Sequence, residues 1–282
     1  MTSTRVLVVS DSHLSARTPE ASANWDAVVA HVDAEGHDLV IHAGDICADG
    51  PGSSGDDLAV AQAALGRLDT RLRVVPGNHD IGDNPFPKAA PDDPLVTPEA
   101  LERFRNALGP DQWMLDLPGW RVVGLNSLLF DTGLDAEADQ WEWFADVLPG
   151  ADDGRQFALV LHKPLAPPPD RPDADPGRYV PPAARDRLLG MVADGGSSLG
   201  VVVSGHVHQH SQHAHDGVLH VWAPTTWATI PDRIQTVLGE KVCGVVELAL
   251  HDDGTLDARC VAPAGFTQNV ILDTVPNPYA LG

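Results

Sequence analysis

Short runs of β-branched and aliphatic residues recur along the chain and predict its strands. Most of these runs are followed directly by Gly, Pro, Asp, Asn or His, as strands that end at a turn or a site commonly are. The predicted strands are Val6–Ser10, Leu39–His42, Leu72–Val75, Arg121–Leu125, Phe157–Leu161, Val201–Ser204, Val218–Trp222 and Val242–Leu250.

Segments rich in Ala and Leu with a helical period separate the earlier strands. The predicted helices are Trp25–Asp33, Leu58–Leu68, Leu101–Leu108 and Ala138–Leu148. Alternating strands and helices indicate βαβ units and a mostly parallel sheet that is buried on both faces. After Val201 the helical pattern fades, and the polar turns at Asp216-Gly217 and 252–254 favour antiparallel hairpins. The pattern therefore predicts an α/β fold with two packed sheets and flanking helices.

The chain shows no internal repeat and no clear linker, so a single domain over 1–282 is expected, with 209–282 forming the last strands and a tail. Its 24 prolines are unevenly placed, because five lie in 81–98 and eight in 164–182. Neither stretch can be a central strand or a helix interior. Each begins close to a polar motif described below, so both are candidate rims of a site. The alternative is that they are surface connections without a role.

The charge balance excludes some partners. Among 282 residues there are 40 Asp and Glu against 18 Lys and Arg, which gives a formal net charge of −22. Binding to nucleic acid or to an anionic membrane needs clustered basic residues, and none are present. Three widely spaced cysteines, the lack of a signal peptide and the lack of a long apolar run predict a cytoplasmic protein. Nothing in the pattern points to a particular oligomeric state.

Five polar motifs each follow directly on a predicted strand. They are Asp11-Ser12-His13, Gly44-Asp45, Gly77-Asn78-His79-Asp80, His162 and Gly205-His206-Val207-His208. Loops at the carboxyl ends of strands gather at one edge of an open α/β sheet, so these side chains should meet there. The set is rich in nitrogen and oxygen donors and nearly lacks sulfur, which suits Mn, Fe or Zn ions rather than a Cys-bound structural zinc.

Two local features support ligation at these motifs. Gly44, Gly77 and Gly205 give the backbone the freedom to leave a strand and turn a ligand inward. On extended backbone, residues two apart point to the same face, so His206 and His208 should both reach one metal cluster, and the same spacing relates Asp11 to His13.

Each candidate also has an ordinary structural explanation. Asp11 and Asp45 are suitable helix N-caps, Asn78 suits a turn, and His162 could be a core histidine. The occurrence of all five motifs in one order argues against these explanations together. For the remaining histidines and tryptophans the structural explanation is preferred. We expect His42 to be a core residue, His210, His213 and His215 to lie on an exposed hairpin, and Trp222 and Trp227 to be core residues, with a substrate pocket as the alternative for the tryptophans.

The order D-x-H, G-D, G-N-H-D, H and G-H-x-H, from Asp11 to His208, resembles the calcineurin-like metallophosphoesterase superfamily. The resemblance implies a four-layer αββα sandwich of two mixed β-sheets flanked by helices. It also implies two metal ions and a hydroxide held between them that attacks a phosphate ester. By the same resemblance, the site residues divide into a first metal group of Asp11, His13 and His208, a second of Asn78, His162 and His206, a bridging Asp45 and a non-ligand acid, His79.

Within the superfamily the chain looks most similar to the bacterial cyclic-nucleotide phosphodiesterases, in its Ser10–Leu14 opening and its compact length. The expected substrates are therefore small phosphodiesters such as 3′,5′-cyclic nucleotides. The alternatives are a phosphomonoesterase acting on small metabolites or phosphoproteins, and a non-catalytic scaffold with the same fold.

Two residues depart from the pattern of that branch. Asp80 stands where many relatives carry Glu, and Lys163 follows His162 where a second histidine is common. We expect Asn78 and His79 to contact the substrate, and Asp80 to support catalysis by holding the second imidazole nitrogen of His79. Lys163 would place a cation beside the second metal, which would favour a doubly charged monoester.

Overall fold

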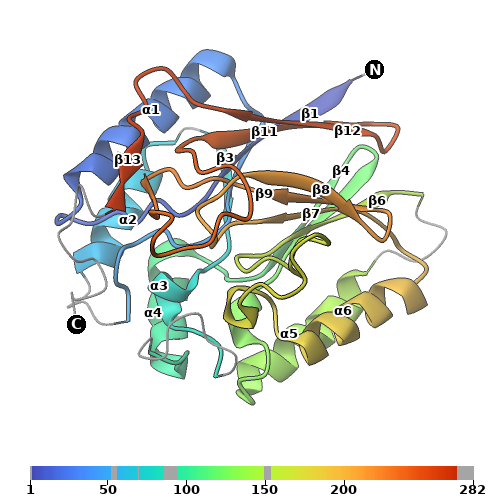
Figure 1. The fold of residues 1–282 in the computed structure, drawn as a ribbon. Helices are drawn as coiled ribbons and strands as arrows, with labels where there is room; N and C mark the ends of the chain where they lie inside the picture. The colour runs from blue at the N-terminus through green and yellow to red at the C-terminus, as the bar shows by residue number, and fades with distance from the viewer. Residues whose placement is uncertain (1, 52–55, 69, 86–93, 149–153, 272–282) are drawn as a thin grey trace.

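The computed structural model describes residues 2–271 except 52–55, 69, 86–93 and 149–153. Part of the first proline-rich stretch and the tail from 272 onward therefore lie outside the described residues. The described chain forms two β-sheets that face each other, with helices on both outer sides (Figure 1). The predicted α/β sandwich with four layers is confirmed.

The first sheet has the strand order β12-β11-β1-β2-β3. Its parallel part consists of β1 (Ser3–Val9), β2 (Leu39–His42) and β3 (Arg71–Val74). The antiparallel strands β11 (Val245–His251) and β12 (Leu256–Val261) extend it beyond β1. The predicted hairpin at 252–254 is thus confirmed.

The second sheet has the order β4-β5-β6-β7-β9-β8. The strands β5 (Trp120–Gly124), β6 (Gln156–Val160), β7 (Ser198–Ser204) and β9 (Val218–Trp222) run parallel. At its edges, β4 (Trp113–Leu117) and β8 (Ser211–His215) are antiparallel to their neighbours. A small parallel pair, β10 (Ala228–Thr229) and β13 (Asn269–Val270), lies apart from both sheets.

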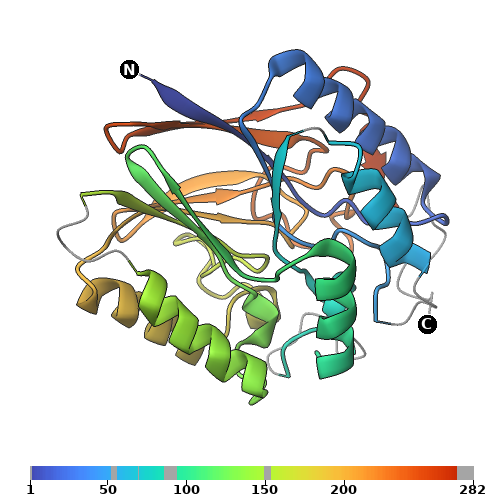
Figure 2. The ribbon, with the colours of Figure 1, turned by 180° about the vertical axis from the view of Figure 1, so that it is seen from behind.

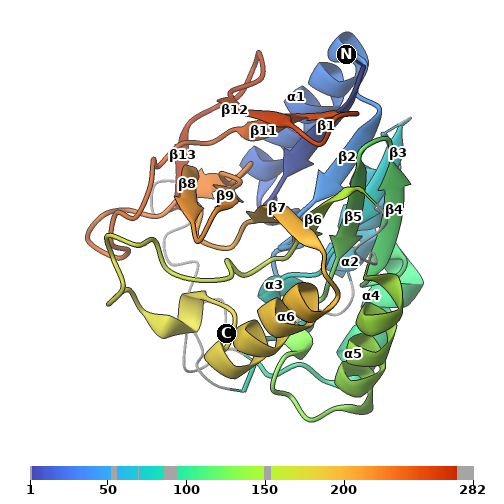
Figure 3. The same ribbon diagram turned by 90° about the vertical axis from the view of Figure 1, so that its right-hand side faces the viewer.

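Helices cover the two outer faces, as the views from behind and from the side show (Figures 2 and 3). α1 (Pro19–Glu35) and α2 (Asp56–Leu65) pack on the first sheet, and α5 (Asp135–Val147) and α6 (Pro182–Asp194) pack on the second. α4 (Pro98–Leu108) packs against α2 and against the short α3 (Asn78–Ile81). Single 3₁₀ turns span Ser127–Leu129 and Pro176–Arg178. No described helix is both long and apolar enough to span a bilayer.

The core between the sheets fixes where the strands end. Val6 and Val8 of β1 and Ile41 of β2 pack against Val160 of β6 and Val203 of β7. Because the side chains of a strand alternate between its two faces, Leu7 and Val9 point the other way, toward α1. Burial on both faces holds the parallel strands in register, so their carboxyl ends lie close together.

All eight predicted strands and all four predicted helices are present, with shifted ends. The described chain also contains elements outside the predicted ranges: β4, β8, β10, β12, β13, α3 and α6. α6 begins at Pro182, which closes the second proline-rich stretch, and α4 begins at Pro98, which closes the first. Proline is favoured in the first turn of a helix because the amide hydrogen that it lacks has no partner there.

Candidate metal centre

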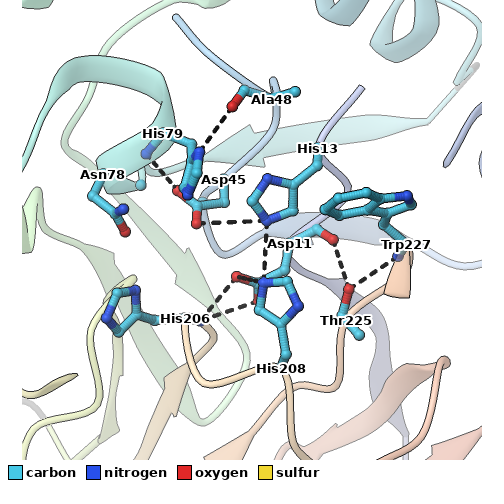
Figure 4. Close-up of polar contacts among 12 residues, drawn as sticks. Asp11, His13, Asp45, Ala48, Asn78, His79, His206, His208, Thr225 and Trp227 are labelled. Atoms are coloured by element: carbon cyan, nitrogen blue, oxygen red, sulfur yellow. Dashed lines mark hydrogen bonds and ion pairs between the residues drawn. The ribbon is translucent and has the colours of Figure 1, made fainter. Parts of the chain in front are cut away.

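The side chains of all seven predicted ligands meet beyond the carboxyl ends of the parallel strands, and Figure 4 labels each of them except His162. Asp11 and His13 follow β1, and Asp45 follows β2. Asn78 is the first residue of α3, just after β3. His162 follows β6, while His206 and His208 follow β7. Six of the seven are buried and His206 is partly exposed.

Four of these side chains form a first group that could hold one metal ion. Its members are Asp11, His13, Asp45 and His208. Nε2 of His13 lies 3.1 Å from Nε2 of His208 and 3.7 Å from Oδ2 of Asp45. Nε2 of His208 lies 3.5 Å from Oδ1 of Asp11. Such separations between donor atoms are those expected around one ion at about 2.0–2.2 Å from each donor.

A second group shares Asp45 with the first. It consists of Asp45, His162 and His206, with Asn78 beside them. Nε2 of His162 lies 3.4 Å from Oδ1 of Asp45, 3.2 Å from Nδ1 of His206 and 3.2 Å from Oδ1 of Asn78. Asp45 therefore presents one carboxylate oxygen to each group.

The tautomers of two imidazoles favour a cation at this place. Nδ1 of His162 lies 2.8 Å from the carbonyl oxygen of Ala43, and Nδ1 of His208 lies 2.8 Å from that of Ala228. Each Nδ1 therefore carries a hydrogen and donates it, so Nε2 of the neutral ring presents a lone pair. For His162 this lone pair faces the carboxylate of Asp45, which is also an acceptor. Positive charge between the two removes the conflict, and a metal ion can supply it in place of a proton on His162, so the donor set fits a metal centre.

The electrostatics of the second group point the same way. Burial raises the pKa of Asp45, but the positive charges of His162 and His79 hold it well below its usual value. Burial lowers the pKa of His162, yet the attraction of Asp45 raises it overall to about 9. A carboxylate that stays charged while fully buried holds positive charge beside it.

Burial shifts the pKa values of Asp11, His13 and His206, which are also predicted ligands. Burial raises the pKa of Asp11, although His208 and His162 offset part of this shift. It lowers the pKa of His13 and His206 well below the usual value. Both imidazoles are therefore neutral at pH 7, which is the form that binds metal ions.

A family model described as calcineurin-like phosphoesterase matches residues 4–210, which is more than half of the chain. The chain belongs to this family. No curated protein matches the chain by sequence. The family and the two buried groups together give a dimetal phosphoesterase fold with a metal-binding His/Asp cluster.

Solved structures of low sequence identity share the fold. The anchor protein GAP50 of the Plasmodium inner membrane complex superposes with a TM-score of 0.63 and 11% identity, over 95% of this chain and 87% of that one. Purple acid phosphatase PPD1 of yellow lupin, Lupinus luteus, superposes with a TM-score of 0.62 and 15% identity, over 92% of this chain and 52% of that one. A dimetal phosphatase from Danio rerio superposes with a TM-score of 0.56 and 13% identity, over 92% of this chain and 99% of that one.

The backbone at the ligands of this phosphoesterase fold is unusual. Of the seven non-glycine residues with positive φ in the described chain, five are predicted ligands: Asp11, His13, Asp45, His206 and His208. Left-handed backbone is unfavourable for side chains other than glycine and accumulates at functional sites. The expectation that His206 and His208 lie on extended backbone is therefore wrong. Both side chains still reach the cluster, His208 in the first group and His206 in the second.

Two glycines are required for different reasons. Gly44 has φ of +96°, so it supplies the backbone freedom that was expected. Gly77 has φ of −107°, which any residue can adopt. A Cβ atom at Gly77 would collide with the Asp45 carboxylate and backbone, so glycine there permits the close approach of the loops after β2 and β3.

His79 stands beside both groups without belonging to either (Figure 4). Its backbone N–H donates to Oδ1 of Asp45 over 2.8 Å, and its ring lies edge to face with His13 at 4.7 Å between centroids. Nδ1 lies 2.8 Å from the carbonyl oxygen of Ala48. The ring is thus oriented through Nδ1.

Asp80 does not take the role that the sequence suggested. The position at Nδ1 of His79 is taken by Ala48, whereas the buried carboxylate of Asp80 accepts hydrogen bonds from the backbone N–H of Ile46, Cys47 and Gly77 at 2.8–3.1 Å. Burial and then the nearby charge of Asp45 raise the pKa of Asp80 to about 6. Asp80 therefore joins the loop that carries Asp45 to the loop that carries Asn78.

Lys163 also differs from expectation. Its Nζ lies 2.5 Å from Oδ1 of Asp83 and 3.0 Å from the carbonyl oxygen of Gly177, and both charged side chains are fully buried. Its charge is compensated by Asp83, although it still contributes, after burial and His162, to the lowered pKa of His206. Lys163 therefore joins the two proline-rich stretches: its ion pair is with Asp83 in the first, and its hydrogen bond is to Gly177 in the second.

Trp227 lies beside the candidate metal centre. The ring of Trp227 lies 5.0 Å from that of His13, while Trp222 is fully buried and packs near Tyr179. His42 is a core histidine, as expected, and its Nε2 lies 2.8 Å from Oγ of Ser12. The β8–β9 hairpin carries His213 and His215 with partial exposure.

Proposed function

We propose that the protein is a dinuclear metal-dependent phosphodiesterase, and that its substrates are small diesters of the 3′,5′-cyclic nucleotide class. The observation that carries the dinuclear assignment is the position of Asp45. Its two carboxylate oxygens face two separate groups of buried donors, at 3.7 Å from His13 and 3.4 Å from His162. A bridging carboxylate of this kind sets two ions close together.

Each ion is assigned its own donors. The first binds Asp11, His13 and His208, the second binds Asn78, His162 and His206, and Asp45 bridges them. Nitrogen and oxygen donors suit Mn, Fe or Zn. When bound, two such ions lower the pKa of a water molecule and neutralise the oxygens of the phosphoryl group.

The remaining chemical task falls to His79. Its Nδ1–H donates to the carbonyl oxygen of Ala48, so Nε2 is directed away from that carbonyl and can hold a proton for the departing oxygen. Asn78 and His79 are adjacent at the start of α3, and we assign both a contact with the phosphoryl group. Asp80 positions the loops and does not touch the reacting atoms.

Preference for a diester rests on Lys163. A phosphomonoester carries about two negative charges at neutral pH and a diester carries one, so an open cation near the ions would favour the monoester. The Lys163 ammonium is instead paired with Asp83 inside the protein. The fixed positive charge beside the second group is reduced accordingly, which supports a singly charged substrate.

A scaffold without catalysis remains the contrasting function, since one protein of this fold is described as an anchor. Loss of catalysis removes the need for a complete donor set. In this chain seven donors converge, five of them on left-handed backbone that is costly to maintain. This supports a working metal centre.

The decisive experiment is an activity panel on protein loaded with Mn²⁺ at measured occupancy. The substrates are bis(p-nitrophenyl) phosphate, p-nitrophenyl phosphate and 3′,5′-cyclic nucleotides, with Asp45→Asn as the inactive reference. We expect kcat/KM for the diesters to exceed that for the monoester. Higher kcat/KM for the monoester would reverse the substrate assignment, and no turnover of any substrate at full occupancy would favour the scaffold.

A further inference from the structure

A second cluster of potential metal ligands lies outside the dimetal centre. His31 of α1, His37 in the turn after α1, and Glu247 of β11 each offer one donor atom, all within 4.8 Å of one another. Of the described residues, these three form the one such group that shares no member with the catalytic ligands.

The cluster is at the far end of α1 from the catalytic groups. α1 begins at Pro19, soon after Asp11 and His13, and His31 lies twelve residues further on, about 18 Å along the helix axis. Gly36, with φ of +66°, ends the helix in left-handed backbone and turns the chain back so that His37 faces β11. The two imidazole rings have a centroid separation of 5.4 Å.

The donor atoms have the separations that a tetrahedral ion requires. Oε1 of Glu247 lies 2.9 Å from Nε2 of His31 and 3.9 Å from Nε2 of His37. Donors about 2.05 Å from a tetrahedral ion are roughly 3.3 Å apart, a value between these two distances. Small rotations of the three side chains would equalise them.

His37 is the residue that most needs an explanation. Its side chain is 1% exposed, and neither ring nitrogen has a hydrogen-bond partner within the described part of the chain. Buried polar atoms without partners are rare and costly. Burial also lowers the pKa of His37, so the ring is neutral and has a lone pair to donate.

Neighbouring residues orient the carboxylate of Glu247 and leave a cleft through which an ion can reach it. Arg259, opposite Glu247 on β12, binds its other oxygen, Oε2, over 2.5 Å, which directs Oε1 toward the imidazoles. A cleft of about 260 Å³ is lined by His37, Glu247, Arg5 and Arg259, so an ion and a water ligand can enter. The positive charges of Arg5 and Arg259 weaken cation binding, so we expect this site to fill after the catalytic one.

We propose that His31, His37 and Glu247 form a mononuclear site for a divalent transition ion such as Zn²⁺, with water as the fourth ligand. Two imidazoles and one carboxylate are a recurrent zinc donor set. The ion would join the C-terminal end of α1 to the first sheet. Its effect is on stability, because the site is remote from the phosphoryl-binding groups.

The test is zinc stoichiometry of the complete protein, measured by elemental analysis after dialysis against free Zn²⁺ in excess of that needed to saturate the catalytic site. We expect His37→Gln and His31→Gln each to bind one zinc ion fewer than wild type and to keep wild-type phosphoesterase activity. The matched control is His251→Gln, which removes an imidazole from the same sheet, paired with Asp257. It should bind as much zinc as wild type.

Thermal unfolding gives a second readout. At a hundredfold excess over Kd, Zn²⁺ should raise the Tm of wild type by roughly 5 °C more than that of His37→Gln. Equal zinc content in wild type and both site variants would overturn the proposal, as would an equal loss in His251→Gln. If His37→Gln does not fold, His31→Gln, whose side chain is partly exposed, decides the outcome.

Discussion

Replacing Lys163 with Met tests whether the two proline-rich stretches are held together by a buried ion pair. Met keeps the length of the side chain and removes the ammonium. Asp83 would keep the N–H of Asn84 at 2.7 Å as a donor to Oδ1 but would lose its cation, and the carbonyl oxygen of Gly177 would lose a donor at 3.0 Å.

The size of the effect follows from the burial of the pair. Both side chains are 0% exposed, so water cannot replace the lost partner. Removing one member of a buried ion pair costs about 3–5 kcal/mol, because the other is left charged and uncompensated. For a chain of this size that corresponds to a fall in Tm of roughly 6–15 °C.

The assay is urea unfolding of the metal-loaded protein at pH 7. A second variant, Lys163→Met with Asp83→Asn, removes the stranded charge and should recover about 2 kcal/mol or more of the loss. The matched control is Arg67→Met at the exposed Arg67–Asp26 pair, where both side chains are about half exposed or more. There the cost should stay below about 1 kcal/mol.

Two results would refute the reasoning. One is a free energy of unfolding for Lys163→Met within about 1 kcal/mol of wild type, because an uncompensated buried carboxylate should destabilise the protein by more than that. The other is a double variant no more stable than Lys163→Met alone. In either case Asp83 finds another partner, and the ion pair does not hold the stretches together.

Three further predictions concern the acid, the rim and the pH response. His79→Ala should lower kcat roughly 10²–10⁴-fold for a ribose-type leaving group and far less for nitrophenolate, and equal losses across leaving groups of graded pKa would remove His79 as the acid. Deleting the exposed residues 169–173 should change the ratio of diester to monoester activity at unchanged metal content, whereas metal lost in proportion to activity would make the segment purely structural. Burial, followed by His213 and His215, lowers the pKa of His220 to about 4, so the unfolded chain binds a proton first and stability falls from pH 6.5 toward pH 4. His220→Gln should recover roughly 2 kcal/mol of the loss at pH 5 in urea unfolding, and an unchanged pH slope would exclude His220 as its source.

Much of the candidate metal centre could be predicted because its signals are local. Asp11, Asp45 and His162 each follow a β-branched strand, and parallel strands bring their carboxyl ends together whatever the details of the core. The contacts that orient these residues depend on segments far apart in the sequence. Asp80 meets the loop after β2, and Lys163 meets Asp83, without any mark in the surrounding sequence.

The left-handed backbone at His206 and His208 could not be predicted either. A spacing of two suggests extended chain at His206 and His208, but the backbone N–H of His206 donates to the carboxylate of Asp11, and the backbone there is left-handed. The cluster around His37 gave no signal either, because Glu247 comes more than two hundred residues after it. Helix α6 was obscured by the prolines before Pro182.

The central claim is that Asp45 joins two metal ions in one catalytic centre. The direct measurement is metal content per chain, determined alongside diester hydrolysis, in wild type, Asp45→Ala and His13→Ala prepared with Mn²⁺ and no added zinc. We predict two ions in active wild type, loss of both from Asp45→Ala, and loss of mainly one from His13→Ala. Fully active protein with one ion or none, or an Asp45→Ala variant that keeps both ions, would contradict the account.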